Sequence, residues 1–344
     1  MFIKLVHRDT LSVEATVERA PNGDLLLLCT CGGTGEPQIE NRVFSFRSKD
    51  DGKAWTKGTQ IHEEDGRAHY QTETARIGDE IRVFISTHDG KFLDWKNYFL
   101  SSYDSGETWQ KHPLPELDRF AFVRGKVDLS NGEMIFPYHA YPIDEKLNEE
   151  SKRENRPAYL NAIEYVENGL LVSRDGGKTF ERRVAFYTML DESFRNSPSC
   201  RFSWNENTVV ELKDGHLVML YRLDRSGWLW RSDSYDYGNT WSEPFRTDIP
   251  NPSNKPRLLK APDGKIILLN TPNANCGLVN RHPLEIWISD DGMKTWGKKI
   301  SLSNFPGMYS YPDGFIDENN CLYAAFEFNR HDIYFFSYNL NEEQ

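Results

Sequence analysis

The stretch "SYDYGNTW", residues 234–241, contains a pattern that recurs along the chain. Ser, Asp, Gly, Thr and Trp follow one another at a nearly fixed spacing. The related stretches are "SKDDGKAW" (48–55), "SYDSGETW" (102–109), "SRDGGKTF" (173–180) and "SDDGMKTW" (289–296). Their central aspartates, at positions 50, 104, 175, 236 and 291, are 54 to 71 residues apart. A repeat of roughly 20–50 residues or more is typical of propellers and other arrays.

The motif has the chemistry of a tight turn. Ser and Asp side chains accept hydrogen bonds from backbone N–H groups of their own turn, and Gly tolerates a positive φ where the chain reverses. The copies depart from the pattern at Ala54, Phe180 and Met293, the last of which stands where Gly is expected. We therefore expect these boxes to be structural turns with a packed aromatic residue, and not sites of chemistry.

A second repeat has the same period. It consists of an apolar strand, a turn with Gly, Asp or Asn, and another apolar strand. The six copies cover residues 15–29, 72–85, 125–138, 208–222, 257–270 and 313–328. Each of the first five copies precedes one Ser/Asp box. Each unit therefore predicts four antiparallel strands, which is the pattern of a propeller blade.

The whole chain of 344 residues is predicted to be an all-β, six-bladed β-propeller in a single domain. The sixth unit lacks a box and supplies three strands, so the N-terminal "MFIKLVH" is expected to add the fourth strand and close the ring without a free edge. A charge-rich insertion, 140–168, is expected in the third blade as a short helix or flap. The predicted blades are 11–57, 66–111, 120–184, 202–245, 254–298, and 308–340 with 1–8.

Composition excludes several classes of protein. The net charge is −11 and no basic stripe is present, which argues against nucleic-acid binding. No apolar run is long enough for a membrane span, and no signal peptide is recognised, so a cytoplasmic location is expected. The five cysteines are odd in number, and Cys29 and Cys31 are expected on opposite faces of a strand, which favours reduced thiols. No metal-ligand spacing is visible, and we expect neither a metal nor a cofactor.

The boxes and the six-unit strand pattern resemble the sialidase (neuraminidase) superfamily, in particular its BNR, or Asp-box, repeat proteins. The resemblance implies an enzyme that binds a sugar carboxylate with three arginines and uses a Tyr/Glu pair as nucleophile and an Asp as acid/base. "NENTVVELKDGHLVMLYR" (205–222) matches one family segment and implies Glu206 and Arg222. "NRHPLEIWISDDG" (280–292) implies Arg281. "YSYPDGFIDENNCLYAAFE" (309–327) implies Tyr311, or with less support Tyr309, as nucleophile.

The first blade departs from the family pattern. Where sialidases have Arg-Ile-Pro, this chain has "SVEATVERAPNGDLL" (12–26), with Glu14 near the expected arginine. A carboxylate at that place is expected to repel a substrate carboxylate. The acid/base aspartate has no direct match, and the nearest loop, "GGTGEPQIEN" (32–41), offers Glu36 and Glu40.

Residues at the heads of the inner strands are expected to converge on one end of the channel. A cluster of carboxylates, arginines and tyrosines suits acid/base chemistry on a sugar. The expected catalytic residues are Tyr311, Glu206, Glu14, Glu36 and His139. The expected substrate-binding residues are Arg124, Arg222, Arg281, Glu73, Tyr70, Lys255, Asp313, Arg330 and His331.

Structural roles remain open for several of these residues: Glu206 can pair with Arg222, and Glu14 with Lys255 or Arg281. The favoured function is an exo-glycosidase acting on an acidic terminal sugar of an oligosaccharide or glycoside, either sialic-acid-like or a uronate. There Tyr311 attacks the anomeric carbon, and Glu14, Glu36, Glu73 or Asp313 protonates the leaving oxygen. Two alternatives are a lyase on uronate-containing glycans, with His139 or a tyrosine as base, and a non-catalytic sugar-binding propeller.

Overall fold

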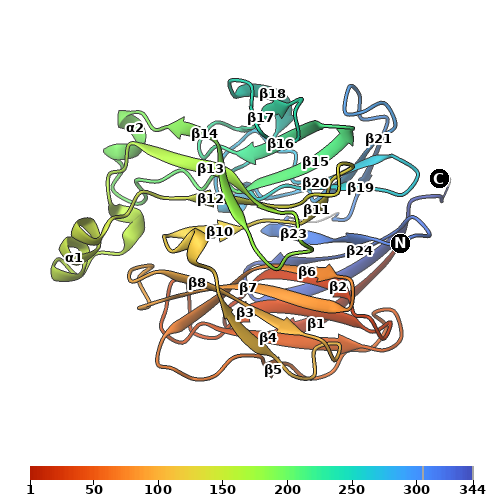
Figure 1. Ribbon diagram of the computed structural model, residues 1–344, viewed down its shortest axis with the longest axis horizontal. Coiled ribbons are helices and arrows are strands. Elements are labelled where there is room, and N and C mark those ends of the chain that lie inside the picture. The colour runs from red at the N-terminus through yellow and green to blue at the C-terminus, as the bar shows by residue number, and fades with distance from the viewer. Residues whose placement is uncertain (304–305, 343–344) are drawn as a thin grey trace.

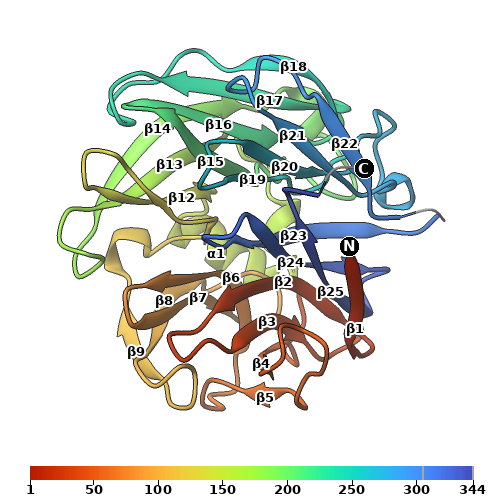
Figure 2. The same cartoon turned by 90° about the vertical axis from the view of Figure 1, so that its right-hand side faces the viewer.

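Six antiparallel sheets are arranged as the blades of a ring in the computed structural model, which describes residues 1–303 and 306–342. Figure 1 shows the ring from its side, and Figure 2 looks at it with the innermost strands around the centre and helix α1 behind them. The six-bladed propeller expected from the repeats is therefore confirmed. Because each strand alternates its side chains between two faces, both faces of every blade pack against neighbours.

Within each blade the strands follow one another in chain order from the centre of the ring to its rim. Blade one contains β2 (Ser12–Arg19), β3 (Leu25–Cys31), β4 (Arg42–Ser48) and β5 (Thr59–Gln60), and blade two contains β6 (Ala68–Ile77), β7 (Glu80–His88), β8 (Lys96–Ser102) and β9 (Gln110–Pro113). Blade three contains β10 (Ala121–Val123), β11 (Val127–Asp128), β12 (Met134–Ala140), β13 (Tyr165–Ser173) and β14 (Glu181–Met189). Blade four contains β15 (Asn207–Lys213), β16 (His216–Arg222), β17 (Trp228–Ser234) and β18 (Phe245–Pro250), and blade five contains β19 (Arg257–Lys260), β20 (Ile266–Asn270), β21 (Glu285–Ser289) and β22 (Lys298–Ser301).

Blade six joins the two ends of the chain. Its strands are β23 (Tyr309–Ile316), β24 (Cys321–Phe328), β25 (Asp332–Asn339) and, at the rim, β1 (Phe2–Arg8). β1 pairs antiparallel with β25, and the Arg8 guanidinium forms a two-pronged ion pair with Asp332 at 2.6 and 2.7 Å. The N-terminal strand thus closes the ring, as the sequence predicts.

Helices are few. They are α1 (Glu145–Arg153), α2 (Glu192–Arg195) and three short 3₁₀ turns, Pro115–Leu117, Ala158–Leu160 and Leu278–Asn280. α1 and the second 3₁₀ turn lie between β12 and β13, and Figure 1 shows α1 projecting from one face of the ring. None of the helices in the described part of the chain is long and apolar enough to cross a membrane.

The repeated boxes form the turns expected of them. In the fourth box the Ser234 hydroxyl accepts a hydrogen bond from the Gly238 N–H at 2.8 Å, and the Asp236 carboxylate accepts from the Thr240 N–H at 2.8 Å. In the fifth box Met293 adopts a left-handed φ of 66° where other copies have Gly, and its N–H still donates to Ser289. The bond pattern therefore survives the change of residue.

The cysteine prediction needs a correction. The Sγ atoms of Cys29 and Cys31 lie 3.3 Å apart in the buried layer between blades one and six, so the two side chains share one face of β3. Side chains at i and i+2 of a strand point the same way, so the expectation of opposite faces was wrong. All five cysteines are free thiols.

All six inner strands run in the same direction through the ring. Their first residues line one mouth of the channel, and residues about three positions further along line the opposite mouth. Because strands alternate in direction, the box turns after the third strands lie on the same face as the opposite mouth. The two faces are thus built from different parts of each repeat.

Candidate active site

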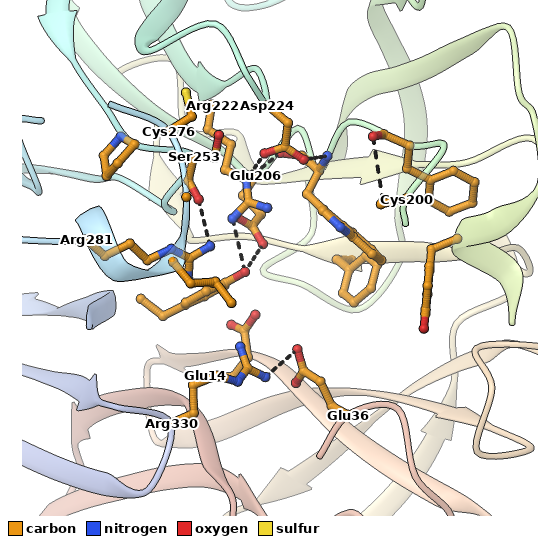
Figure 3. A pocket seen from close by; sticks show the side chains of 18 of the residues that line it. Glu14, Glu36, Cys200, Glu206, Arg222, Asp224, Ser253, Cys276, Arg281 and Arg330 are labelled. Carbon is orange, nitrogen blue, oxygen red and sulfur yellow. Dashed lines mark hydrogen bonds and ion pairs between the residues drawn. The ribbon is translucent and has the colours of Figure 1, made fainter. Parts of the chain in front are cut away.

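A pocket of about 760 Å³ lies at the mouth where the inner strands begin. Figure 3 shows Arg281, Ser253 and Arg222 on one side of this pocket and Glu14, Arg330 and Glu36 on the other. Nine of the residues expected from the sequence line this pocket, and all six blades contribute to the set. They are Glu14, Glu36, Tyr70, Arg124, Glu206, Arg222, Arg281, Tyr311 and Arg330.

Tyr311 and Glu206 form the centre of the pocket. The Tyr311 hydroxyl donates a hydrogen bond of 2.5 Å to Glu206 Oε1, and Arg222 donates to the same hydroxyl at 3.2 Å. The Arg222 guanidinium also forms an ion pair of 2.6 Å with Glu206 Oε2. Both roles considered for Glu206 are therefore present in one geometry: it pairs with Arg222 and it can accept the phenolic proton of Tyr311.

The pKa of the Tyr311 hydroxyl is raised above its ordinary value. Burial is the main cause, and the charge of Glu206 adds to it, while Arg222 and Arg281 act in the opposite direction. The hydroxyl is therefore protonated in the resting protein. Any attack by this oxygen requires that its proton moves to Glu206 in the same step.

The backbone presents Glu14 and Tyr311 in the same unusual way. Each has a left-handed φ, 55° for Glu14 and 54° for Tyr311, and each lies in a bulge of its strand. Non-glycine residues adopt this conformation at a cost, and such strain gathers at functional sites. The bulges turn both side chains toward the channel.

Glu14 is held by two cations. Its carboxylate forms a two-pronged ion pair with Arg124 at 2.6 and 3.1 Å, and Lys255 Nζ lies 3.6 Å from Glu14 Oε2. Arg124 was expected to bind a substrate carboxylate, and the structure instead commits it to Glu14. Burial lowers the pKa of the Arg124 guanidinium, but the charges of Glu14 and Glu206 outweigh burial and the net shift is upward.

Glu36 is held at the rim of the pocket. Its carboxylate accepts a hydrogen bond of 2.8 Å from the Tyr70 hydroxyl and forms an ion pair of 2.7 Å with Arg330. Its side chain is 19% exposed, which leaves one edge open to a ligand. Glu40, the other carboxylate of this loop, is exposed and does not line the pocket.

Arg281 differs from the other buried arginines of the pocket. It donates to Ser310 Oγ at 3.1 Å and to the Ser253 carbonyl at 2.7 Å, and its guanidinium lies 5.5 Å from the centre of the Tyr311 ring. None of the carboxylates in residues 1–303 and 306–342 lies within ion-pair distance of it. Burial without such a partner lowers its pKa.

An aromatic wall faces the charged groups. It contains Phe92, Phe122, Tyr159, Phe202 and Trp204, which also pack against one another. Phe122 lies on β10, Tyr159 comes from the insertion that carries α1, and the other three come from loops of blades two and four. Flat apolar faces beside polar groups are suited to the faces of a sugar ring.

Four expected residues lie in the core or on the surface and do not line this pocket. His139 is on β12 beneath Phe122 and is fully buried, and burial followed by the charges of Arg124, Arg222 and Lys255 lowers its pKa well below the ordinary value. His331 is exposed in a turn, where its ring contacts the Thr10 carbonyl at 2.5 Å. Lys255 is buried below the floor, and Tyr309 packs against Phe326 in the core.

Glu73 and Asp313 belong to the opposite mouth. Both line a second hollow of about 620 Å³ together with Arg257, which pairs with Asp313 at 3.0 Å and with Glu73 at 3.6 Å. Glu73 lies three residues after Tyr70, and Asp313 lies two residues after Tyr311. Two or three residues along an inner strand are enough to place a side chain on the other side of the channel floor. No pattern in the sequence indicates where the floor of the channel lies.

Several lining residues were missed from the sequence. Asp224 pairs with Arg222 at 3.0 Å, and the spacing in "YRLD" (221–224) was a usable signal. Ser253 follows "NP" before the fifth inner strand and offers its carbonyl to Arg281. Tyr159 and Phe92 had no motif, because they enter the pocket from an insertion and a loop.

A scan against protein families gives one match that covers most of the chain. The model described as a BNR repeat-like domain matches residues 71–323. The chain belongs to this family. A search of curated proteins found no match to this BNR propeller.

Solved structures with the same fold include several sialidases. The Hadza microbial sialidase Hz136 has a TM-score of 0.70 and 17% identity, with 96% of this chain and 66% of that chain covered. A protein of unknown function from Dyadobacter fermentans has a TM-score of 0.70 and 19% identity, with 97% of both chains covered. The NanB sialidase from Streptococcus pneumoniae has a TM-score of 0.68 and 14% identity, with 99% of this chain and 70% of that chain covered. The BNR propeller is thus sialidase-like in fold.

Proposed function

We propose that this BNR propeller is an exo-glycosidase that hydrolyses an acidic terminal sugar from a glycoside or oligosaccharide. The observation that carries the proposal is the contact between Tyr311 and Glu206 on the pocket floor. A buried phenol with a 2.5 Å hydrogen bond to a carboxylate, and an arginine at 3.2 Å, is a nucleophile with its base in place.

In the proposed reaction the Tyr311 oxygen attacks the anomeric carbon while its proton passes to Glu206. Arg222 lies within hydrogen-bond distance of that oxygen and stabilises the negative charge that develops on it. The bond to the leaving oxygen breaks as the tyrosyl–sugar bond forms. Water then cleaves this bond in a second step, and the Tyr311 oxygen recovers its proton.

Glu36 is the carboxyl group proposed to protonate the leaving oxygen. Of the four candidates from the sequence, Glu14 is committed to Arg124, and Glu73 and Asp313 line the opposite mouth. Glu36 lines the pocket, is partly exposed and lies on the side away from Glu206 in Figure 3. A general acid needs this kind of access to the leaving group.

The test is turnover of a fluorogenic sialoside beside a panel of uronate-terminated oligosaccharides, with wild type, Tyr311→Phe and Glu206→Gln. We expect release of the terminal sugar by the wild type and loss of it in both variants, with an unchanged melting temperature for Tyr311→Phe. An unsaturated uronate product, detected by its ultraviolet absorbance, would instead assign a lyase. Sugar binding without turnover of any substrate in the panel would assign a binding protein.

A further inference from the structure

The charged groups of the pocket are almost completely paired with one another. Glu14 pairs with Arg124, Glu36 with Arg330, and Glu206 and Asp224 with Arg222. Arg225 lies at the exposed rim and donates to the carbonyls of Ser193 and Cys200. Among the described residues that line the pocket, Arg281 is the buried cation without an acidic partner.

Arg281 is 4% exposed and retains unused donors. Two of its N–H groups donate to Ser310 and Ser253, and its Nε–H has no partner in the described structure. A buried charge without a counterion is costly, and a ligand anion would relieve that cost. The pocket is therefore prepared for one anionic group at Arg281.

Glu14 limits the pocket to one site for an anionic group. Its carboxylate accepts hydrogen bonds from both terminal nitrogens of Arg124 and lies 3.6 Å from Lys255 Nζ. The Tyr70 hydroxyl, which donates its proton to Glu36, lies 3.4 Å from the Glu14 carboxylate. A ligand anion would need the same two Arg124 N–H groups that the Glu14 carboxylate already occupies. Glu14 thus neutralises Arg124, which lines the pocket and would otherwise attract a ligand anion to this side of it.

We propose that Glu14 is a specificity-determining residue: by closing Arg124 to ligands, it restricts the pocket to sugars with a single anionic group, held at Arg281. A sugar with a second anionic group, such as a sulfate, meets the Glu14 carboxylate and is repelled. The part of the sugar that faces the Glu14–Arg124 pair carries uncharged hydroxyl groups. This inference rests on the proposed function, because it takes the pocket to be a site for acidic sugars.

Three features favour a role in selectivity over one in packing alone. Glu14 lines the pocket, its backbone has a left-handed φ of 55°, and its N–H is fixed by the Glu327 carboxylate at 3.0 Å. The chain therefore accepts local strain to hold an acidic side chain at this point. A packing role alone is equally served by an uncharged pair of residues.

The experiment measures binding by calorimetry at fixed ionic strength, so that it does not depend on turnover. The probes are N-acetylneuraminate and D-glucuronate as single anions and 2-O-sulfo-D-glucuronate as a double anion. We expect the wild type to bind at least one single anion more tightly than the double anion. Glu14→Gln keeps the shape of the side chain and frees Arg124, so the affinity for the double anion should rise about tenfold or more.

Two variants separate this mechanism from a general change in charge. Glu73→Gln removes a carboxyl group from the opposite mouth and should leave all three affinities within about twofold. The double variant Glu14→Gln/Arg124→Met removes the freed guanidinium and should return the double anion to weak binding. Arg281→Met in an otherwise wild-type chain should lose the single anion by about tenfold or more, which tests the proposal even if Glu14→Gln does not fold.

The proposal is overturned if Glu14→Gln leaves the preference between single and double anions unchanged, or if the double variant binds the double anion as tightly as Glu14→Gln. It is also overturned if Arg281→Met keeps its affinity or if the wild type binds none of the three probes. Selectivity that reverses as expected in a protein without turnover would support this inference and reject the hydrolase. Turnover without that reversal would support the hydrolase and reject this inference.

Discussion

The two mouths of the channel are similar in size and in charge but differ in chemistry. The hollows measure about 760 and 620 Å³, and both are floored by carboxylates and cations. The pocket mouth adds a tyrosine on a carboxylate, an arginine without an acidic partner and an aromatic wall. At the opposite mouth Arg257 lies between Glu73 and Asp313, and among the described residues no tyrosine hydroxyl bonds to any of the three.

A continuous series of ion pairs connects the two mouths. It runs from Glu206 through Arg124, Glu14, Lys255 and Asp313 to Arg257 and Glu73, with signs that alternate at each step and distances of 2.6 to 3.8 Å. The same kind of interaction therefore serves both ends. Clustered charge alone therefore does not distinguish a candidate active site from a structural ion-pair cluster. A charged group without an acidic partner, such as Arg281 beside Tyr311, is the better indicator.

The largest expected effect separates the mouths by turnover. Tyr311→Phe removes the proposed nucleophile and should lower kcat by about 10³-fold or more, and Glu206→Gln removes the proposed base and should lower it by about 10²–10⁴-fold. Glu73→Gln, at the opposite mouth, should stay within about threefold of the wild type. Steady-state kinetics on the substrate found in the panel measures all three. A loss of kcat in Glu73→Gln comparable with that in Glu206→Gln would contradict the division of roles between the mouths.

A second prediction tests the series of ion pairs as a structural link. Lys255 is 2% exposed and bridges Glu14 and Asp313, so Lys255→Met leaves two buried carboxylates short of one cation. The free energy of unfolding should fall by about 3–5 kcal/mol. Urea denaturation measures the loss.

The matched control for that variant is Lys265→Met. Lys265 forms a 2.5 Å pair with Asp263 in a turn near the surface, where solvent screens the interaction. Its loss should change the unfolding free energy much less than that of Lys255. Equal losses in the two variants would mean that the buried series contributes no more than a surface pair.

The features of the two mouths that the sequence could predict depend on how far apart in the chain the interacting residues lie. The boxes and hairpins are local, since the bonds of Asp236 and Ser234 stay within a few residues, and they predicted the blades and the ring closure. Glu206, Arg281 and Tyr311 could be predicted because each lies in a segment that resembles the sialidase family pattern. These residues are distant in sequence and become neighbours only because the blades form a closed ring, and the repeat predicts that ring.

The errors have equally physical causes. Asp313 was expected in the pocket because it is close to Tyr311 in sequence, yet a bulge and two further residues move it across the channel floor. The pairing of Glu14 with Arg124 joins residues 110 positions apart in different blades, which no local pattern reports. His139 lies near the end of β12, the second strand of its blade, and in this fold that position lies behind an inner strand and not in the channel.

The third prediction concerns pH. Burial, with the nearby charge of Asp313, raises the pKa of Glu73 from 4.5 to about 7. Between these values the folded chain keeps a proton that the unfolded chain has lost, so stability falls as pH rises from about 4.5 to 7. Glu73→Gln removes this fall and should raise the unfolding free energy at pH 8 by about 1–3 kcal/mol relative to the wild type.

The pocket mouth offers the counterpart of that experiment. Glu327 is buried, and burial raises its pKa to about 7, with Arg330 opposing and Glu36 and Glu14 adding to the shift. Glu327→Gln should flatten the same part of the stability curve, but it should also impair the sugar site because the Glu327 carboxylate holds the Glu14 N–H. Denaturation curves at pH 5 and pH 8, with turnover at each pH, distinguish the two mouths. A steeper fall of stability with pH in either variant would contradict the assigned pKa values.

The smallest effect is expected at the box turns, on the face of the opposite mouth. Asp236 accepts hydrogen bonds from the N–H and hydroxyl of Thr240, so Asp236→Ala leaves these donors to water at an exposed turn. The unfolding free energy should fall by about 1 kcal/mol. kcat/KM should not change, because the turn lies at the far end of its blade from Tyr311 and shares no partner with it. If kcat/KM instead falls together with stability, the boxes are coupled to the pocket, and the separation of the two faces into a structural side and a chemical side does not hold.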